Sequence, residues 1–374
     1  MRKYELSISA DYVPAWGVVE ATREFFQNAL DEETRDASNK MMLEYDPEKE
    51  LLKIGNKHSK LDIKTLLFGN TTKADNDEMI GNHGEGYKIA TVVLLRNGKT
   101  VTFQNYCRHE VWRPRLVRSR KYDGMMVPTF FVENNAIWMK APEHSLIIEI
   151  GGITAEEYEK IQAANLHLQE YEKSETRYGD ILEDKRFVGK VFVGGLYICE
   201  EPRLDNFGLD FKPSWVRLER DRSMVNSFDV QWYAARMIEE SADSDLIKSS
   251  IDHYSGTYVN EWSIPDELKD EIAEDFINRY GAKAVPVTNQ SDLEKMKKRG
   301  WKPVIVTEAK KKIILASKYF ADVQEEYRKL RESEKPLADR FCSFIEKIEE
   351  KLSEEETRQL YEFLDEIQEG SEGE

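Results

Sequence analysis

The chain has 374 residues, a formal net charge of −17 and a hydrophobic fraction of 40%. This length predicts two or three domains, and the apolar content excludes an intrinsically disordered chain. So acidic a protein is not built for non-specific binding of nucleic acid, although a local basic patch is compatible with it.

The cysteines and the N-terminus indicate the compartment. Cys107, Cys199 and Cys342 lie far apart and form no Cys-x-x-Cys pair, so their spacing supports neither a zinc site nor a disulfide framework. The first residues lack the apolar stretch of a signal peptide, and no apolar run approaches the length of about 20 residues that a membrane span needs. We therefore expect a cytoplasmic protein without membrane contact.

The first 155 residues alternate helix and strand patterns. Apolar residues at helical spacing predict a helix over 18–37, a hairpin is predicted over 40–56, and short and longer helices are predicted over 61–69 and 87–98. Four strand-like runs follow, at 99–107, 109–122, 129–140 and 144–152. This order predicts a first domain, 1–155, of the α/β class with a mostly antiparallel sheet.

The remainder predicts three further parts. A domain over 156–250 is expected to begin with an acidic helix at 154–171, followed by strands at 188–201 and a helix at 228–240. Residues 251–316 alternate helix and strand, which indicates a small α/β domain. Residues 317–374 are heavily charged, and we expect helices there with a frayed end.

A polar pattern stands out on the first predicted helix. Glu24 and Asn28 are four residues apart, and Asp31 is seven residues from Glu24, so all three fall on one helical face. A carboxylate can act as a general base, and an asparagine carbonyl oxygen is a hard ligand that suits Mg²⁺. The competing interpretation is an ordinary solvated helix face.

A glycine cluster follows about fifty residues later. Gly81, Gly84 and Gly86 lie within six positions and precede Lys88 and an apolar run. Glycines let backbone N–H groups approach an anion, and the start of a helix adds favourable charge. The spacing excludes a P-loop, because no Ser or Thr follows Lys88, and it excludes the dinucleotide fingerprint, because no strand precedes it.

The order of these motifs resembles the GHKL ATPase superfamily, which includes gyrase B subunits, ninety-kilodalton heat-shock chaperones, sensor histidine kinases and MutL proteins. The segment "REFFQNALDE" at 23–32 is similar to the family's first motif, and "IGNHGEGYKIA" at 80–90 is similar to its glycine motif, most closely in chaperones and MutL proteins. The resemblance implies a Bergerat-type ATP-binding sandwich of the α/β (α+β) class. It also implies that Glu24 activates water and that Asn28 binds Mg²⁺.

Further site residues are implied by the same resemblance. "TTK" at 71–73 is similar to the start of the MutL ATP lid, and Ser145 takes the place of a threonine whose hydroxyl lies near the adenine. The cofactors implied are ATP and Mg²⁺, with the nucleotide contacted by Asn28, Asp31, Asn56, Thr72, Lys73, Gly81, Gly84, Gly86, Lys88 and Ser145.

One motif departs from the family pattern. An Asp-x-Gly-x-Gly segment usually follows the second hairpin strand, and its aspartate reads the adenine amino group. Here the segment is "IGNKHS" at 54–59, with Gly55 or Asn56 in place of the aspartate. Asn56 could accept a hydrogen bond from an amino group, but it is displaced by one position.

The second domain resembles the transducer or middle domain of the same family. There an arginine before a helix reaches the γ-phosphate, and Arg220 matches that position best, with Arg222 as the alternative. An arginine fork suits phosphate and transition-state charge. The competing interpretation is a surface salt-bridge cluster within "RLERDR".

Two other features have structural explanations that compete with functional ones. Residues 108–122 interleave basic and aromatic side chains, which is compatible with nucleic-acid binding, but a long hairpin with charged faces is favoured. His58, His83, His109 and His144 lack the spacing of metal ligands.

The predicted function is Mg-dependent binding and slow hydrolysis of ATP, which drives lid closure and domain rearrangement in a clamp-like or chaperone-like switch. We expect a protein client, and the sequence leaves open whether the protein forms a homodimer. The alternative is a nucleotide-binding or protein-interaction module on the same fold without hydrolysis. A sensor histidine kinase is disfavoured, because here the ATP domain begins the chain.

Overall fold

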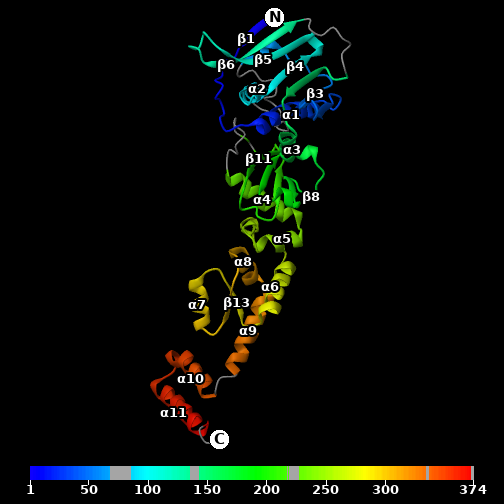
Figure 1. Cartoon of the computed structure of the whole chain (residues 1–374). Coiled ribbons are helices and arrows are strands. Elements are labelled where there is room, and N and C mark those ends of the chain that lie inside the picture. Colours follow the sequence, from blue (N-terminus) through cyan, green and yellow to red (C-terminus); the bar gives the residue numbers. More distant parts are fainter. Residues whose placement is uncertain (68–85, 135–142, 217, 219–226, 334–336, 372–374) are drawn as a thin grey trace. The chain divides into compact units, whose positions relative to one another are not determined.

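The computed structural model describes residues 1–67, 86–134, 143–216, 218, 227–333 and 337–371. The chain divides into two compact units, 1–241 and 242–374 (Figure 1). The first unit contains a seven-stranded sheet and a five-stranded sheet.

A seven-stranded sheet forms the first half of unit 1. Its strand order is β1-β6-β5-β4-β7-β3-β2, and every neighbouring pair is antiparallel. The strands are β1 (Arg2–Glu5), β2 (Met41–Asp46), β3 (Leu51–Asn56), β4 (Thr100–Asn105), β5 (Glu110–Arg118), β6 (Met126–Asn134) and β7 (Leu146–Gly151). The prediction of an α/β domain with an antiparallel sheet is confirmed.

Two helices, α1 (Val18–Arg35) and α2 (Gly86–Arg96), pack together and contact the sheet, with α1 against β3 and α2 against β4 and β5 (Figure 1). The strands alternate accordingly, as in β4, where Val101, Phe103 and Asn105 are buried and Thr102 and Gln104 are only half-buried. Phe103 packs edge-on against Phe25 of α1, with ring centroids 5.9 Å apart. The core therefore lies between one sheet face and this helix pair.

The same alternation determines on which face of the sheet the last residues of β3 lie. Leu52 and Ile54 are fully buried and belong to the core shared with α1. Because side chains alternate along a strand, Asn56 lies on this helix-covered face, whereas Gly55 lies on the opposite face.

Three details of unit 1 differ from the sequence-based expectation. The helix expected over 154–171 is shorter, since α3 spans only Ala155–Ala163 and the 3-10 helix η3 (Leu166–Leu168) follows. The helix expected over 61–69 is a single 3-10 turn, η1 (Ile63–Leu66). Strand β1 was not predicted at all.

The second half of unit 1 is a five-stranded sheet with the order β11-β10-β12-β9-β8. Its strands are β8 (Lys173–Glu175), β9 (Gly179–Leu182), β10 (Lys190–Val193), β11 (Leu196–Glu200) and β12 (Gly208–Phe211). The predicted break at Gly194-Gly195 is the β10–β11 turn, where both glycines have positive φ. Helix α4 (Ser227–Ser241) follows and contacts β9.

Asp210 on β12 gives this sheet a testable pH dependence. Its Oδ1 accepts a 2.8 Å hydrogen bond from the backbone N–H of Gly195. Burial raises the pKa of Asp210 to about 7, against the lowering effect of the Gly195 bond and with Asp180 and Lys173 as smaller influences. The folded state therefore retains a proton that the unfolded chain releases, so the free energy of unfolding falls as pH rises from about 4 to about 7.

We expect Asp210→Asn to remove this loss, because the amide oxygen still accepts from Gly195 and does not titrate. Relative to the unsubstituted protein, the variant should gain about 1–3 kcal/mol between about pH 5 and about pH 8. Urea unfolding at several pH values measures the difference. Parallel pH profiles for the two proteins would contradict the assignment.

Unit 2 is helical apart from a two-stranded parallel pair, β13 (Ala284–Val287) and β14 (Lys302–Ile305). The order of helix and strand from α6 to α8 agrees with the small α/β pattern expected over 266–316. The helices are α5 (Ser244–Ile251), α6 (Asp266–Tyr280), α7 (Gln290–Lys298), α8 (Glu308–Ala316), α9 (Lys318–Ser333), α10 (Leu337–Ile348) and α11 (Glu354–Ser371). In the described part of the chain, no helix is both long and apolar enough to cross a bilayer.

Candidate functional site

Helix α1 carries a stripe of polar side chains formed by Glu24, Gln27, Asn28 and Asp31. Their spacing of three, four and seven residues places them on one side of the helix. Glu24, Gln27 and Asp31 are only 1–2% exposed, and Asn28 is half-buried. The interpretation of this side as a solvated helix face is therefore wrong. Burying carboxylates costs free energy unless cations or donors compensate them, so the stripe is a candidate site.

Asn28 is held in an orientation that suits a hard cation. Its Nδ2 donates a 2.8 Å hydrogen bond to the backbone oxygen of Glu24, one turn earlier. This bond uses the amide nitrogen and so directs Oδ1 away from its own helix backbone. An amide oxygen is a suitable ligand for Mg²⁺, which usually takes one or two protein ligands together with phosphate oxygens and water. The residue predicted to bind Mg²⁺ thus has the donor atom that the ion requires.

No group of three or more His, Cys, Asp or Glu side chains with the arrangement of a metal site occurs among the residues that the structure describes. A nucleotide-bound Mg²⁺ does not need such a group, since the phosphates supply most of its charge.

Asn56, at the end of β3, lies directly beside the same helix. Its Nδ2 donates to the backbone oxygens of Ala29 (2.9 Å) and Asn39 (3.2 Å), and its side chain is 3% exposed. Carbonyl oxygens only accept, so both bonds fix the amide nitrogen and leave Oδ1 as the acceptor of the group. The sequence alone left open whether Gly55 or Asn56 takes the place of the aspartate. The alternation of side chains along β3 places Asn56 on the side of α1.

Gly55 could not carry the aspartate that the family motif places in its register. A Cβ there would lie 2.6 Å from the backbone oxygen of Leu146 on the neighbouring strand. Any side chain at residue 55 would also point to the sheet face away from α1. The departure from the motif therefore has a structural cause in the tight β3–β7 pairing.

Ser145 lies next to Asn56, just before β7. Its backbone N–H donates to the backbone oxygens of Asn56 and Lys57, both at 3.1 Å, and its hydroxyl donates to the backbone oxygen of Ser59 at 2.7 Å. The structure thus brings together helix α1, at Ala29, the end of β3 and the start of β7. These are three of the segments that the sequence predicted to form one site.

Gly86 and Lys88 open helix α2. Gly86 is half-buried, and the Lys88 side chain is fully buried with its Nζ donating to the backbone oxygens of Thr65 (3.0 Å) and Leu67 (2.8 Å). Lys88, predicted to contact the nucleotide, therefore also joins the start of α2 to the end of η1.

Several predicted site residues lie outside the described part of the chain. They are Thr72, Lys73, Gly81, Gly84, Arg220 and Arg222, together with His83.

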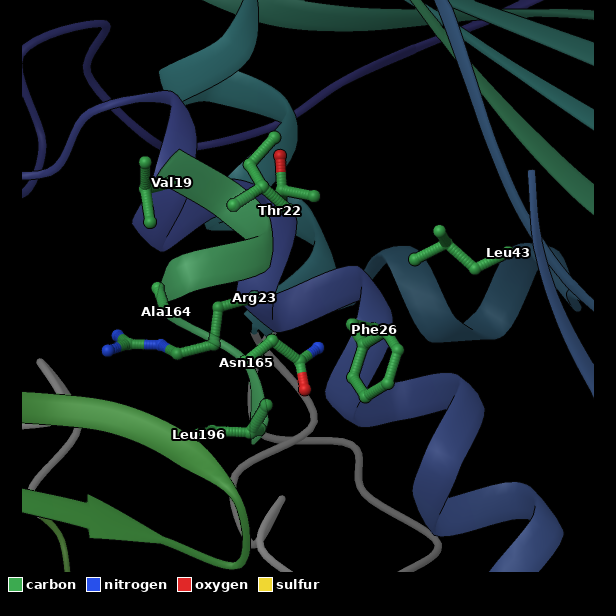
Figure 2. A pocket seen from close by; sticks show the side chains of 9 residues that line it. Val19, Thr22, Arg23, Phe26, Leu43, Ala164, Asn165 and Leu196 are labelled. Carbon is green, nitrogen blue, oxygen red and sulfur yellow. The ribbon is translucent and has the colours of Figure 1, made fainter. Parts of the chain in front are cut away.

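The reverse side of α1 contacts the second sheet. Arg23 donates through Nη1 to the backbone oxygen of Tyr197 on β11 at 2.9 Å, and its guanidinium lies over the ring of Trp16. Figure 2 shows Thr22, Arg23 and Phe26 of α1 around a small cavity with Asn165 and Leu196. The cavity offers about 10 Å³ to the centre of a water molecule, which is about the room that one water needs. It is too small for a nucleotide and lies on the side of α1 away from the polar stripe.

The basic hairpin has internal partners. Arg108 pairs with Asp62, Arg113 pairs with Glu133 at 2.9 Å, and Arg115 lies over Phe131 on the outer sheet face. Arg108, Arg113 and Arg115 of the hairpin thus have partners within the protein, as is usual for charged side chains on a hairpin surface.

No protein-family model and no curated protein matches the sequence. Among solved structures, the fold is similar to the ATPase region of Saccharomyces cerevisiae topoisomerase II (12% identity, TM-score 0.28, 48% of this chain and 62% of that chain). The same region bound to ICRF-187 (dexrazoxane) is also similar, at 12% identity and a TM-score of 0.28 over 56% of both chains.

The ATPase and transducer domains of DNA topoisomerase II from Balamuthia mandrillaris match at 15% identity and a TM-score of 0.30, over 50% of this chain and 61% of that chain. The chain therefore spans about three fifths or less of the structures that it resembles.

Sequence reasoning missed two residues of α1. Arg23 contacts the second sheet, and Gln27 shares the buried polar stripe. The spacing of Gln27, three residues after Glu24 and four before Asp31, was the available signal.

Proposed function

We propose that unit 1 binds Mg-ATP at the polar stripe of α1 and hydrolyses it slowly. The observation that supports the proposal is the largely buried polar stripe of Glu24, Asn28 and Asp31 on α1. Asn56 contacts the same helix at Ala29, and Ser145 is bonded to Asn56. In this arrangement Asn28 Oδ1 ligates Mg²⁺, which offsets phosphate charge. Gly86, Lys88 and, outside the described residues, Thr72, Lys73, Gly81 and Gly84 complete the contacts to the nucleotide.

Glu24 is the general base of the proposed reaction. Its carboxylate accepts a proton from water as the water oxygen bonds to the γ-phosphorus and the bond to the bridging oxygen breaks, which releases ADP and phosphate. The buried location of Glu24 keeps bulk water from competing for that carboxylate. Arg220 or Arg222 supplies positive charge to the γ-phosphate, and lid closure then rearranges the domains, with a protein client or a second copy as the partner.

Calorimetric titration with Mg-ATP tests the proposal. Asn28→Ala should weaken Mg-dependent binding at least about tenfold, because the contact of a polar group with a charged one contributes about 1.5–3 kcal/mol. Asn97→Ala is the matched control, since Asn97 makes the same amide-to-backbone bond one turn back, to Val93 at 2.7 Å, at the end of α2. No heat with the unsubstituted protein would refute the proposed function.

In this proposal, Asn56 reads the adenine through Oδ1, which accepts from the 6-amino group. Placing a carboxylate at residue 56 should therefore do harm. Asn56→Asp would replace both donors to Ala29 and Asn39 by an acceptor, so we expect a loss of about 2–4 kcal/mol in stability and no gain in ATP affinity. Chemical unfolding and ATP titration measure the two effects. Tighter ATP binding by Asn56→Asp would show that Asn56 is not oriented as described.

A further inference from the structure

The side-chain amide of Gln27 is a buried donor for which the described residues offer no acceptor. Its side chain is 1% exposed, and its Nε2 has no hydrogen-bond partner among the residues that the structure describes. Leaving a buried amide N–H₂ unsatisfied is costly, so native proteins rarely keep one without a reason. A ligand that brings its own acceptor is such a reason.

Gln27 belongs to the polar stripe of α1. Gln27 lies three residues after Glu24 and four before Asp31, so the three side chains form one stripe on the helix. Neither carboxylate takes the Nε2 hydrogens, although both are acceptors and near in sequence. A neutral donor between two acidic residues is suited to an anionic oxygen that must be held close to them, because it adds attraction where the carboxylates repel.

We propose that Gln27 contacts the bound nucleotide, with Nε2 donating to a phosphate oxygen of a nucleoside triphosphate. This rests on the proposed function and adds a contact residue to that site. The donor stays unsatisfied until the nucleotide binds. The unsatisfied donor lowers the stability of the protein without nucleotide and so favours the bound state.

This assignment makes two predictions of opposite sign. In Gln27→Met, an apolar side chain of similar length replaces the unsatisfied amide, so the protein without nucleotide should unfold at the same temperature as the unsubstituted protein or higher. The same variant loses a hydrogen bond to a charged group, so its dissociation constant for the Mg²⁺ complex of a non-hydrolysable ATP analogue should rise about ten- to hundredfold. A merely structural glutamine would lower the unfolding temperature when replaced.

Thr22 provides the matched control. Its Oγ1 is also buried and without a partner among the described residues, but it lies on the same helix at the cavity facing the second sheet (Figure 2). Thr22→Val should likewise leave the unfolding temperature unchanged or raised, whereas its affinity for nucleotide should stay unchanged. Gln27→Glu should bind nucleotide more weakly than Gln27→Met, because it adds a carboxylate beside the phosphates.

Thermal unfolding and calorimetric titration of the full chain give all the readouts. If the unsubstituted protein and Gln27→Met bind the analogue equally, the buried donor holds only a water and the inference is wrong. A lowered unfolding temperature of Gln27→Met without nucleotide would also overturn it. If the unsubstituted protein itself binds no nucleotide, the proposed function fails first, and the titration of that protein alone shows this.

Discussion

Glu24→Gln is expected to reduce the steady-state rate of ATP hydrolysis by about two to four orders of magnitude, the usual contribution of a general base. The amide is nearly isosteric with the carboxylate but cannot accept the proton of the attacking water. Glu24 is 1% exposed, with Arg23 Nε 3.9 Å from its Oε1. Binding of Mg-ATP should be retained, since no bond to the ground-state nucleotide is assigned to this carboxylate.

A phosphate-release assay measures the rate, and calorimetry measures binding by the same preparation. Glu32→Gln is the control on the same helix, because Glu32 pairs with Arg35 outside the polar stripe. An unchanged rate in Glu24→Gln would remove Glu24 from the reaction, even if nucleotide binding holds. Absence of turnover together with firm binding in the unsubstituted protein would favour the nucleotide-binding module.

Phe103→Ala is expected to lower the free energy of unfolding of unit 1 by about 3–5 kcal/mol, as large-to-small changes at buried aromatics do. Phe103 is fully buried, and its ring meets Phe25 of α1, Tyr87 of α2 and Phe130 of the sheet at centroid distances of 5.9, 6.2 and 5.9 Å. Removing it opens a cavity where both helices meet the sheet. Since α1 carries the polar stripe, nucleotide affinity should fall as well.

Phe131→Ala is the matched control, because it removes the same ring from the opposite face of the same sheet. Phe131 is half-buried between Lys3 and Arg115, which lie over its ring at 5.6 and 5.9 Å. Its replacement should cost about 1 kcal/mol. Urea unfolding monitored by tryptophan fluorescence measures both variants, and equal losses would contradict the placement of the core on the helix side.

The long, periodic elements were predictable because their own patterns specify them. Helix α1, the β2–β3 hairpin and the apolar strand β7 all follow from spacing within the segment. Strands β8, β9 and β12 have only three or four residues each. Strand β9 pairs with β8 in a short hairpin and with β12, which follows later in the chain. Strands this short contain too few residues for a periodic pattern to predict them.

The candidate site divides along a similar line. Glu24, Asn28 and Asp31 could be found from helical spacing, since the relation between them is local. Choosing Asn56 over Gly55 required the register of β3 against β7, and recognising Gln27 required its burial. Both depend on contacts between segments that are far apart in the chain, so they became visible only in three dimensions.

The buried bonds of Lys88 have a consequence for how the chain tolerates change. Its ammonium holds the backbone at Thr65 and Leu67, while its own backbone lies just after Gly86. The described residues on either side of 68–85 are thus fixed to each other by contacts within the domain. In such a closed arrangement, doubling the length of the intervening chain costs only about 0.6 kcal/mol of closure entropy. Insertions within 68–85 should therefore leave the fold intact, whereas nucleotide binding should tolerate only those that spare Thr72, Lys73, Gly81 and Gly84.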